Sequence, residues 1–201
     1  VLVANNSRVI PARLYGRKTS GGKTEALLLN QIDATTWEAL MTGKMRPGTR
    51  TLFSPGGQEG TQPQLEAEVV EVRDSGARLL RFPQPVEALL GALGAMPLPP
   101  YITAPLTNPE RYQTVYSAEA GSAAAPTAGL HWTPELIARA KEHGVAWAEV
   151  TLHVGLDTFR PVQVENALDH AMHREWYTFG PEAAAAINAA KRSLAAPIEP
   201  Q

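Results

Sequence analysis

Hydrophobic and polar residues alternate along residues 145–154, which is the clearest pattern in the chain. One face is wholly apolar, with Ala146, Ala148, Val150, Leu152 and Val154. The other face carries Val145, Trp147, Glu149, Thr151 and His153. A period of two predicts a β-strand whose apolar face points into a core. Gly155 ends the pattern, so residues 155–161 are expected to form a loop after the strand.

Three polar side chains follow one another at the end of this predicted strand. His153 closes the strand, and Thr158 and Arg160 lie in the loop that follows. In α/β proteins the carboxyl ends of strands are the usual position of ligands. The pattern therefore marks a candidate functional site here. A satisfied surface histidine beside a turn is an equally good interpretation of the residue types alone.

Short apolar segments separated by turn residues fill the first 82 residues. Strands are expected at 1–4, 8–16, 24–32, 36–41, 51–53, 65–72 and 77–82. Pro11 places the second of these strands at an edge or a bend, and Gly21-Gly22 predicts a hairpin. Strands this short and closely spaced indicate a small antiparallel barrel or sandwich from about Arg13 to Phe82.

Helical patterns become frequent after this region. Helices are expected at 85–93, 108–116, 134–143 and 181–190. Tyr112 and Tyr116, four positions apart, would share one face of the second helix. Thr133 is suited to be the N-cap of the third helix, which Gly144 ends. Because this helix leads directly into the strand at 145–154, the two form half of an α/β unit.

The predicted fold class is α/β, with two domains. A discontinuous α/β domain comprises residues 1–12 and 83–201, and a small β-barrel domain of residues 13–82 is inserted into it. The chain lacks an initiator Met and opens inside an apolar strand. We therefore expect a fragment, or a chain that lacks its start.

Composition narrows the classes of function. The 201 residues are 44% hydrophobic and 19% charged, as in an ordinary globular protein with a real core. The absence of cysteine excludes disulfides, Fe–S clusters and thiolate metal sites, and suits a reducing compartment. No apolar run approaches the roughly 20 residues that a membrane span needs. With a net charge of -2, any nucleic-acid binding must depend on a local basic patch.

One such patch is present near the start of the chain. Five cationic residues precede the first acidic residue, Glu25: Arg8, Arg13, Arg17, Lys18 and Lys23. The run predicts either a solvated face or an edge that binds phosphates.

Two other segments are candidates for binding sites. Residues 121–129, G-S-A-A-A-P-T-A-G, have no bulky side chain, so another group can approach their backbone closely. Neither the Walker spacing nor the dinucleotide fingerprint is present. His170 and His173, three positions apart on a predicted helix, could bind a metal. Because no third ligand lies at an obvious spacing, we expect no metal there.

Six motifs occur in the order found in one protein family. They are N-x-S-R-V-I-P-A-R from Asn5, M-P-L-P-P-Y-I from Met96, R-Y-Q-T-V-Y from Arg111, A-A-P-T-A-G-L-H from Ala124, V-T-L-H-V-G-L-x-T-F-R-P-V from Val150 and M-H-x-E-x-Y from Met172. On these motifs the chain resembles the S-adenosylmethionine:tRNA ribosyltransferase-isomerases of queuosine biosynthesis, from Val1 to about Lys191.

The resemblance implies an open α/β barrel-like domain with an inserted small antiparallel β-barrel. It implies a cytoplasmic bacterial enzyme that moves the ribosyl moiety of S-adenosylmethionine onto 7-aminomethyl-7-deazaguanine at the tRNA wobble position. Adenine and methionine leave, and epoxyqueuosine forms. The implied partners are S-adenosylmethionine as co-substrate and a tRNA with a queuosine-type anticodon. No metal, prosthetic group or membrane is implied, and we expect a monomer.

The chain departs from the family pattern in three places. The family has a segment before Val1, and it continues past Lys191 with a glycine-rich strand and a further motif. Asp157 stands where a glycine is usual. Both ends of the family's chain are therefore expected to be missing here.

The resemblance and the chemistry together suggest roles for individual residues. The sulfonium acidifies the adjacent C5′ hydrogen, and His153 or His131 would suit the general base. Thr158 and Arg160 complete the predicted catalytic group. The predicted substrate-binding residues are Arg8, Tyr101, Tyr112, Gln113, Tyr116, Pro126 and Thr127. Arginine suits the methionine carboxylate and the tyrosines suit stacking on a base, and neither motif nor spacing selects the base catalyst. The residues predicted to hold tRNA phosphates are Arg13, Arg17, Lys18 and Lys23.

Two alternatives stay open. An S-adenosylmethionine-dependent RNA methyltransferase is disfavoured because the glycine-rich strand–helix start of that class is missing. A non-catalytic RNA-binding module built on the β insertion is the other alternative. Release of adenine from S-adenosylmethionine would distinguish the enzyme from both.

Overall fold

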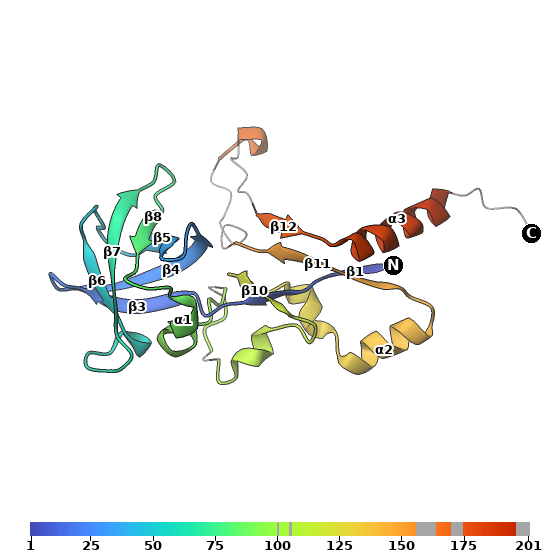
Figure 1. Ribbon diagram of the computed structural model, residues 1–201, viewed down its shortest axis with the longest axis horizontal. Coiled ribbons are helices and arrows are strands. Elements are labelled where there is room, and N and C mark those ends of the chain that lie inside the picture. The colour runs from blue at the N-terminus through green and yellow to red at the C-terminus, as the bar shows by residue number, and fades with distance from the viewer. Residues whose placement is uncertain (100, 105, 156–163, 170–174, 196–201) are drawn as a thin grey trace, which may run out of the picture. The chain divides into compact units, whose positions relative to one another are not determined.

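A computed structural model describes residues 1–99, 101–104, 106–155, 164–169 and 175–195 of the chain (Figure 1). The chain divides into two compact units. One consists of residues 1–9 and 105–201, and the other of residues 10–104. No helix in these described ranges is long and apolar enough to cross a membrane.

The unit of residues 10–104 is a closed barrel of six antiparallel strands. The strands are β3 (Arg13–Lys18), β4 (Lys23–Gln31), β5 (Thr36–Met41), β6 (Arg50–Phe53), β7 (Leu65–Val72) and β8 (Arg78–Arg81). They pair in the order β4-β5-β8-β7-β6-β3, and β3 pairs with β4 to close the sheet. The small antiparallel barrel predicted from the strand spacing is confirmed.

Every second side chain along the strands points inward, and these side chains fill the barrel. Its buried core includes Leu14, Ala26, Leu28, Ala39, Phe53, Val69 and Leu80. Gly16 also points inward, and a Cβ there would lie 2.5 Å from the Leu52 carbonyl oxygen and 2.8 Å from the Phe53 ring. Because β6 approaches so closely, only glycine fits at this position of β3. The β3–β4 hairpin turns through Gly21 and Gly22, both at positive φ, as predicted.

The short helix α1 (Glu87–Leu93) and strand β9 (Gly94–Ala95) pack with the barrel. Leu90 and Leu93 on α1 are buried in the barrel core. Strand β9 pairs with the first two residues of β3, whereas β6 pairs with the last three, so two strands share this edge. Residues 83–104, assigned to the α/β domain by composition, therefore cluster with the barrel, because the apolar side of α1 covers its core.

The other unit is mixed α/β. A three-stranded sheet contains β1 (Leu2–Asn5), β11 (Trp147–His153) and β12 (Trp176–Thr178). Strands β1 and β11 are parallel, and β12 is antiparallel to β11. A second, parallel pair joins β2 (Ser7–Val9) to β10 (Glu119–Ser122).

Two helices and three 3₁₀ turns complete the described part of this unit. They are α2 (Pro134–Glu142), α3 (Pro181–Ala195), η2 (Pro109–Tyr112), η3 (Thr127–His131) and η5 (Ala167–Asp169). The Thr133 hydroxyl accepts a hydrogen bond from the Leu136 N–H at 3.2 Å, which confirms it as the N-cap of α2. The barrel unit contains one further turn, η1 (Pro55–Gly57).

Three expectations about local structure were wrong. The predicted strand at 8–16 is two strands that end and begin around Pro11, so Arg8 and Arg13 belong to different units. The helix expected at 108–116 ends at Tyr112, because Gln113 is extended and its amide bonds to the Val9 backbone. Tyr112 and Tyr116 therefore share no helical face.

The two faces of β11 also differ from those expected from alternation. Thr151, placed on the outward face, is only 7% exposed, whereas Val150 and Leu152 on the predicted core face are half-buried. The Thr151 hydroxyl donates a hydrogen bond of 2.8 Å to Asn6 Oδ1. The segment around Asn6 therefore covers the face that alternation had assigned to solvent.

Candidate functional site

His153 ends β11, and its ring contacts two other segments. Trp176 is its cross-strand partner on β12, and the two rings stack with 5.2 Å between centroids and 19° between planes. Gly121 lies under the imidazole, where a Cβ would come within 2.8 Å of the ring. Gly121 also has a φ of 142°, so it is a glycine for two reasons. The prediction that another group approaches the backbone of residues 121–129 is confirmed.

Side chains from three other segments hold the backbone on both sides of His153. Asn5 accepts a hydrogen bond from the Leu152 N–H at 3.0 Å and donates one to its carbonyl at 2.9 Å. The Ser122 hydroxyl, fully buried, accepts from the Val154 N–H at 3.0 Å. The Glu175 carboxylate accepts from the Gly155 N–H at 3.0 Å. This end of β11 is therefore a fixed platform for the imidazole.

The surroundings of His153 favour its neutral form. Burial lowers its pKa below the ordinary value of 6.5, and the Glu119 carboxylate opposes this effect. Its Nδ1 atom is buried and has no hydrogen-bond partner among the described residues. A neutral imidazole on a rigid strand end can accept a proton from a ligand.

An aromatic cluster lies at the other end of β11. The Trp147 ring meets Tyr116 and Trp132 edge-on, with centroids 5.2 Å and 5.4 Å apart. Burial raises the pKa of the Tyr116 hydroxyl, and the Glu149 carboxylate adds to the effect.

His131, the alternative base, is exposed at the end of η3. No described hydrogen bond or ring contact joins it to His153.

Several predicted substrate-binding residues have partners within the protein. Arg8 forms an ion pair with Glu110 and donates a hydrogen bond of 2.9 Å to the Ser117 hydroxyl. The Gln113 amide accepts from the Val9 N–H at 3.0 Å and donates to its carbonyl at 2.8 Å. These contacts fix β2 in place. A ligand carboxylate at Arg8 would have to join or displace Glu110.

The remaining predicted substrate-binding residues differ in exposure. Tyr112 is 3% exposed, whereas Tyr101 is 71% exposed and belongs to the unit that contains the barrel. Pro126 and Thr127 begin η3, and Thr127 is exposed. A Cβ on Gly129, in the same turn, would lie 2.2 Å from the Tyr116 hydroxyl oxygen. The structure thus brings Tyr116 together with the small residues of η3.

The cations predicted to hold phosphates lie on β3 and β4 of the barrel. Arg13 forms an ion pair with Glu25, and Arg17 Nε lies 3.0 Å from Glu59 Oε1. Lys18, on the opposite side of the strand from Arg17, donates to the Lys44 carbonyl at 2.9 Å. Lys23 is exposed and directly opposite Arg17 in the strand register.

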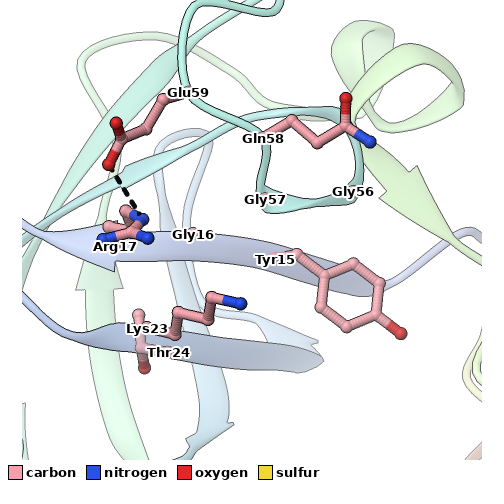
Figure 2. A pocket seen from close by; sticks show the side chains of 9 residues that line it. All are labelled: Tyr15, Gly16, Arg17, Lys23, Thr24, Gly56, Gly57, Gln58 and Glu59. Carbon is pink, nitrogen blue, oxygen red and sulfur yellow. Dashed lines mark ion pairs between the residues drawn. The ribbon is translucent and has the colours of Figure 1, made fainter.

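A pocket opens over this part of the barrel (Figure 2). Its volume is about 430 Å³, and it lies between the outer faces of β3 and β4 and the loop that begins at η1. Its lining includes Tyr15, Arg17, Lys23, Gly57, Gln58 and Glu59. No sequence pattern was interpreted as a pocket at this position. The available signal was the glycine pair at 56–57 beside a strand.

Four predicted residues, Thr158, Arg160, His170 and His173, lie outside the described part of the chain. Among the described residues, no group of three or more histidine, aspartate or glutamate side chains could hold a metal ion.

Comparison with known proteins places the chain in a family. The model of a family described as "Queuosine biosynthesis protein" matches residues 1–196. The chain belongs to this family. The family expected from the six motifs is therefore confirmed.

Curated relatives support the membership. The S-adenosylmethionine:tRNA ribosyltransferase-isomerase of Clostridioides difficile is 54% identical over 195 residues, which cover 96% of this chain and 56% of that protein. The enzyme of the same name from Carboxydothermus hydrogenoformans is 50% identical over 196 residues, with the same coverage. The chain thus spans a little over half the length of these relatives.

A solved structure also matches. It is the crystal structure of an S-adenosylmethionine tRNA ribosyltransferase from Thermotoga maritima, 26% identical, with a TM-score of 0.34. The match covers 95% of this chain and 47% of that chain.

Proposed function

We propose that the protein is an S-adenosylmethionine:tRNA ribosyltransferase-isomerase. It transfers the ribosyl moiety of S-adenosylmethionine to 7-aminomethyl-7-deazaguanine at the tRNA wobble position and gives epoxyqueuosine, adenine and methionine. The observation that carries this proposal is the family match over residues 1–196, together with relatives of that name that are 50–54% identical. Methionine is a good leaving group because it departs from the positively charged sulfonium as a neutral thioether.

His153 is the proposed general base. The positive sulfur of S-adenosylmethionine acidifies the C5′ hydrogen, and a neutral imidazole can take that proton at neutral pH. Burial, which lowers the pKa of His153, supports this role. The three side chains that hold the neighbouring backbone groups would keep the ring in position. His131, which is exposed, is the second candidate for the base.

The other assignments follow the predicted roles. Arg160 and Arg8 bind the methionine carboxylate, and Thr158 belongs to the catalytic group. Tyr116 and Tyr101 offer rings for stacking on a base. Tyr112, Gln113, Pro126 and Thr127 shape the substrate site, and the contacts of Gln113 with Val9 support an indirect role through the position of β2.

The partners and setting are part of the same proposal. The catalytic domain is an open α/β barrel-like domain into which the β-barrel is inserted. The sequence assigned residues 1–12 and 83–201 to it, but residues 10–12 and 83–104 cluster with the barrel. The protein acts in the cytoplasm as a monomer on a tRNA with a queuosine-type anticodon. S-adenosylmethionine is a co-substrate, and no prosthetic group or metal is needed.

The test is release of adenine. The protein is mixed with S-adenosylmethionine and an anticodon stem–loop RNA that carries 7-aminomethyl-7-deazaguanine at the wobble position. We expect adenine and methionine in equal amounts and an RNA heavier by the transferred sugar. His153→Ala should reduce turnover by roughly 10²–10⁴-fold with the fold retained.

The alternatives give different products. A methyltransferase would yield methylated RNA and S-adenosylhomocysteine, with no free adenine. A non-catalytic module would bind the RNA and leave S-adenosylmethionine unchanged. Either result would contradict the proposed reaction.

A further inference from the structure

The pocket on the barrel has a preformed roof. The loop after β6 returns over β3, where the Ser54 N–H donates to the Tyr15 carbonyl at 3.1 Å. The Gln58 carbonyl accepts from the hydroxyls of Ser54 at 2.8 Å and Thr61 at 2.6 Å, which closes the loop on itself. Gly57 sits directly over β3 with a φ of 69°, and a Cβ there would lie 3.1 Å from Tyr15 Cβ. The sequence therefore keeps this loop tight against the strand.

The floor of the pocket has an excess of positive charge. Arg17 and Lys23 are directly opposite each other on the antiparallel strands β3 and β4. Like charges in such a pair destabilise a sheet unless an anion lies between them. Glu59 supplies one carboxylate, at 3.0 Å from Arg17 and with a side chain that is 75% exposed. Two cations and one carboxylate leave a net charge of one in the pocket, which suits one further anionic group.

An aromatic wall stands beside these charges. Tyr15 is two residues before Arg17 on the same face of β3, so the two side chains leave the strand about 7 Å apart and both line the pocket. Figure 2 shows the Tyr15 ring at one end of the floor, Arg17 at the other, and the Gln58 amide above. Among the described residues, the Gln58 side chain forms no hydrogen bond. An aromatic face, an open amide and an anion site thus line one cavity.

We propose that this pocket binds one unstacked nucleotide of a single-stranded RNA segment, with the base on Tyr15 and its phosphate at Lys23 and Arg17. This inference deepens the proposed function, on which it rests, since it assigns a contact with the tRNA substrate outside the site of chemistry. Glu59 holds Arg17 until the phosphate arrives and then turns to solvent.

The chemistry of the pocket favours this ligand over simpler ones. Inorganic phosphate would use the cations and leave the tyrosine ring and the amide without a role. A duplex would present phosphates but no free base face, whereas proteins that bind single-stranded RNA combine cations with aromatic stacking. The cavity of about 430 Å³ lies in the range of sites that hold small molecules and is large enough for one nucleotide.

The test measures RNA binding by fluorescence anisotropy. The probe is a stem–loop RNA with a single-stranded loop, and its comparison is the same sequence fully paired as a duplex. Tyr15→Leu should weaken stem–loop binding roughly five- to 150-fold and leave duplex binding unchanged. Lys23→Gln should reduce the slope of log K against log salt by about 0.7, the value for one phosphate contact on a single strand.

Matched variants control for stability and for charge. Tyr15→Phe keeps the ring and should bind the stem–loop as the parent does. Lys44→Gln removes an exposed lysine of the same barrel outside the pocket, and should leave the salt slope almost unchanged. Thermal melts of each variant confirm that the barrel is folded, which is expected because both Tyr15 and Lys23 are on its outer face.

Two results would overturn the pocket assignment. One is stem–loop binding by Tyr15→Leu and Lys23→Gln that equals that of the parent. The other is a competition result: inorganic phosphate displaces the stem–loop RNA as well as uridine 5′-monophosphate does. In that case the pocket would be an anion site that does not recognise a base. Adenine release by the same proteins separates the two proposals. Tyr15-dependent RNA binding without adenine release contradicts only the proposed reaction, and adenine release without that dependence contradicts only the pocket.

Discussion

The imidazole of His153 lies nearly parallel to the indole of Trp176, with 5.2 Å between ring centroids. The two residues are cross-strand partners on β11 and β12, so the sheet itself fixes their stacking. Trp176 is 59% exposed, and the pair therefore lies where a ligand can reach it. The indole shields one face of the imidazole from water and contributes to the burial that lowers its pKa.

Removal of this shield should change the titration of His153. Trp176→Ala exposes the imidazole, so the pKa of His153 should rise toward 6.5. Glu119→Gln should lower the pKa further, because the Glu119 carboxylate favours the charged form. The measurement is an NMR titration of the His153 ring protons. Shifts in the same direction for both variants would contradict this account.

The pH dependence of kcat/KM should follow the titration of His153. A base with a lowered pKa is deprotonated at neutral pH, so the acidic limb of kcat/KM should lie below pH 6.5. In Trp176→Ala that limb should move to higher pH. If the acidic limb of kcat/KM in the parent protein lay above pH 6.5, His153 would be excluded as the base.

Gly121→Ala should displace the imidazole. The added methyl group would come within 2.8 Å of the ring, and a φ of 142° adds strain of roughly 1–3 kcal/mol. Gly144→Ala is the matched control, because its φ is also positive and no atom lies within 4 Å of the added methyl group. Both variants should lose stability, and only Gly121→Ala should shift the His153 ring signals. Identical spectra for the two would refute the close approach.

Asn5→Ala should destabilise the end of β11. The Asn5 side chain accepts from the Ser7 and Leu152 N–H groups, both at 3.0 Å, and donates to the Leu152 carbonyl. Loss of these three hydrogen bonds leaves the Ser7 N–H and the Leu152 N–H and carbonyl without their partner. The free energy of unfolding should therefore fall by about 1–3 kcal/mol. Asn30→Ala, which removes one exposed bond to Glu38, should stay within about 0.5 kcal/mol. Urea denaturation compares the two.

Tyr116 should make the protein sensitive to alkali. Burial raises its pKa above 10, so between pH 10 and that higher value only the unfolded chain releases this proton. The unfolded state then binds fewer protons, and stability falls as the pH rises. Tyr116→Phe should reduce this alkaline loss in thermal melts. Tyr177→Phe, at an exposed position on β12, controls for removal of a hydroxyl.

Chelation should leave the protein active. His170 and His173 are the histidine pair with metal-like spacing, and no third ligand is expected beside them. Prolonged dialysis against a chelator should therefore preserve adenine release, and elemental analysis should find no stoichiometric metal. A tightly bound zinc ion would overturn this expectation.

Local patterns in the sequence were sufficient to predict the barrel, because short apolar segments with turn residues between them mark its strands one by one. Thr133 and Pro134 likewise marked the start of α2. Thr151 could not be placed from its own segment, since its burial depends on Asn6, which comes from a distant part of the chain. The ion pair of Arg17 in the basic run could not be predicted for the same reason. Arg17 contacts Glu59 only because the loop after β6 returns over β3.

The contacts of His153 show the same limit. Its position as the last residue of a strand was readable, but the segments that touch its ring are fixed by tertiary structure. The absence of bulky residues from 121 to 129 indicated that some group approaches closely. It gave no sign that this group is His153.

The short pairing between β3 and β9 has a consequence for the order of folding. It brings the two ends of the barrel segment together, with Arg13 beside Ala95. The bonds between Asn5 and Leu152 join residues 147 positions apart, and such a contact closes a long loop. A barrel that folds first cuts that loop roughly in half, which saves only about 0.6 kcal/mol of closure entropy. Early folding of the barrel should therefore mainly increase the rate of folding, because fewer mobile residues then separate the two strands of the parallel β1–β11 pair.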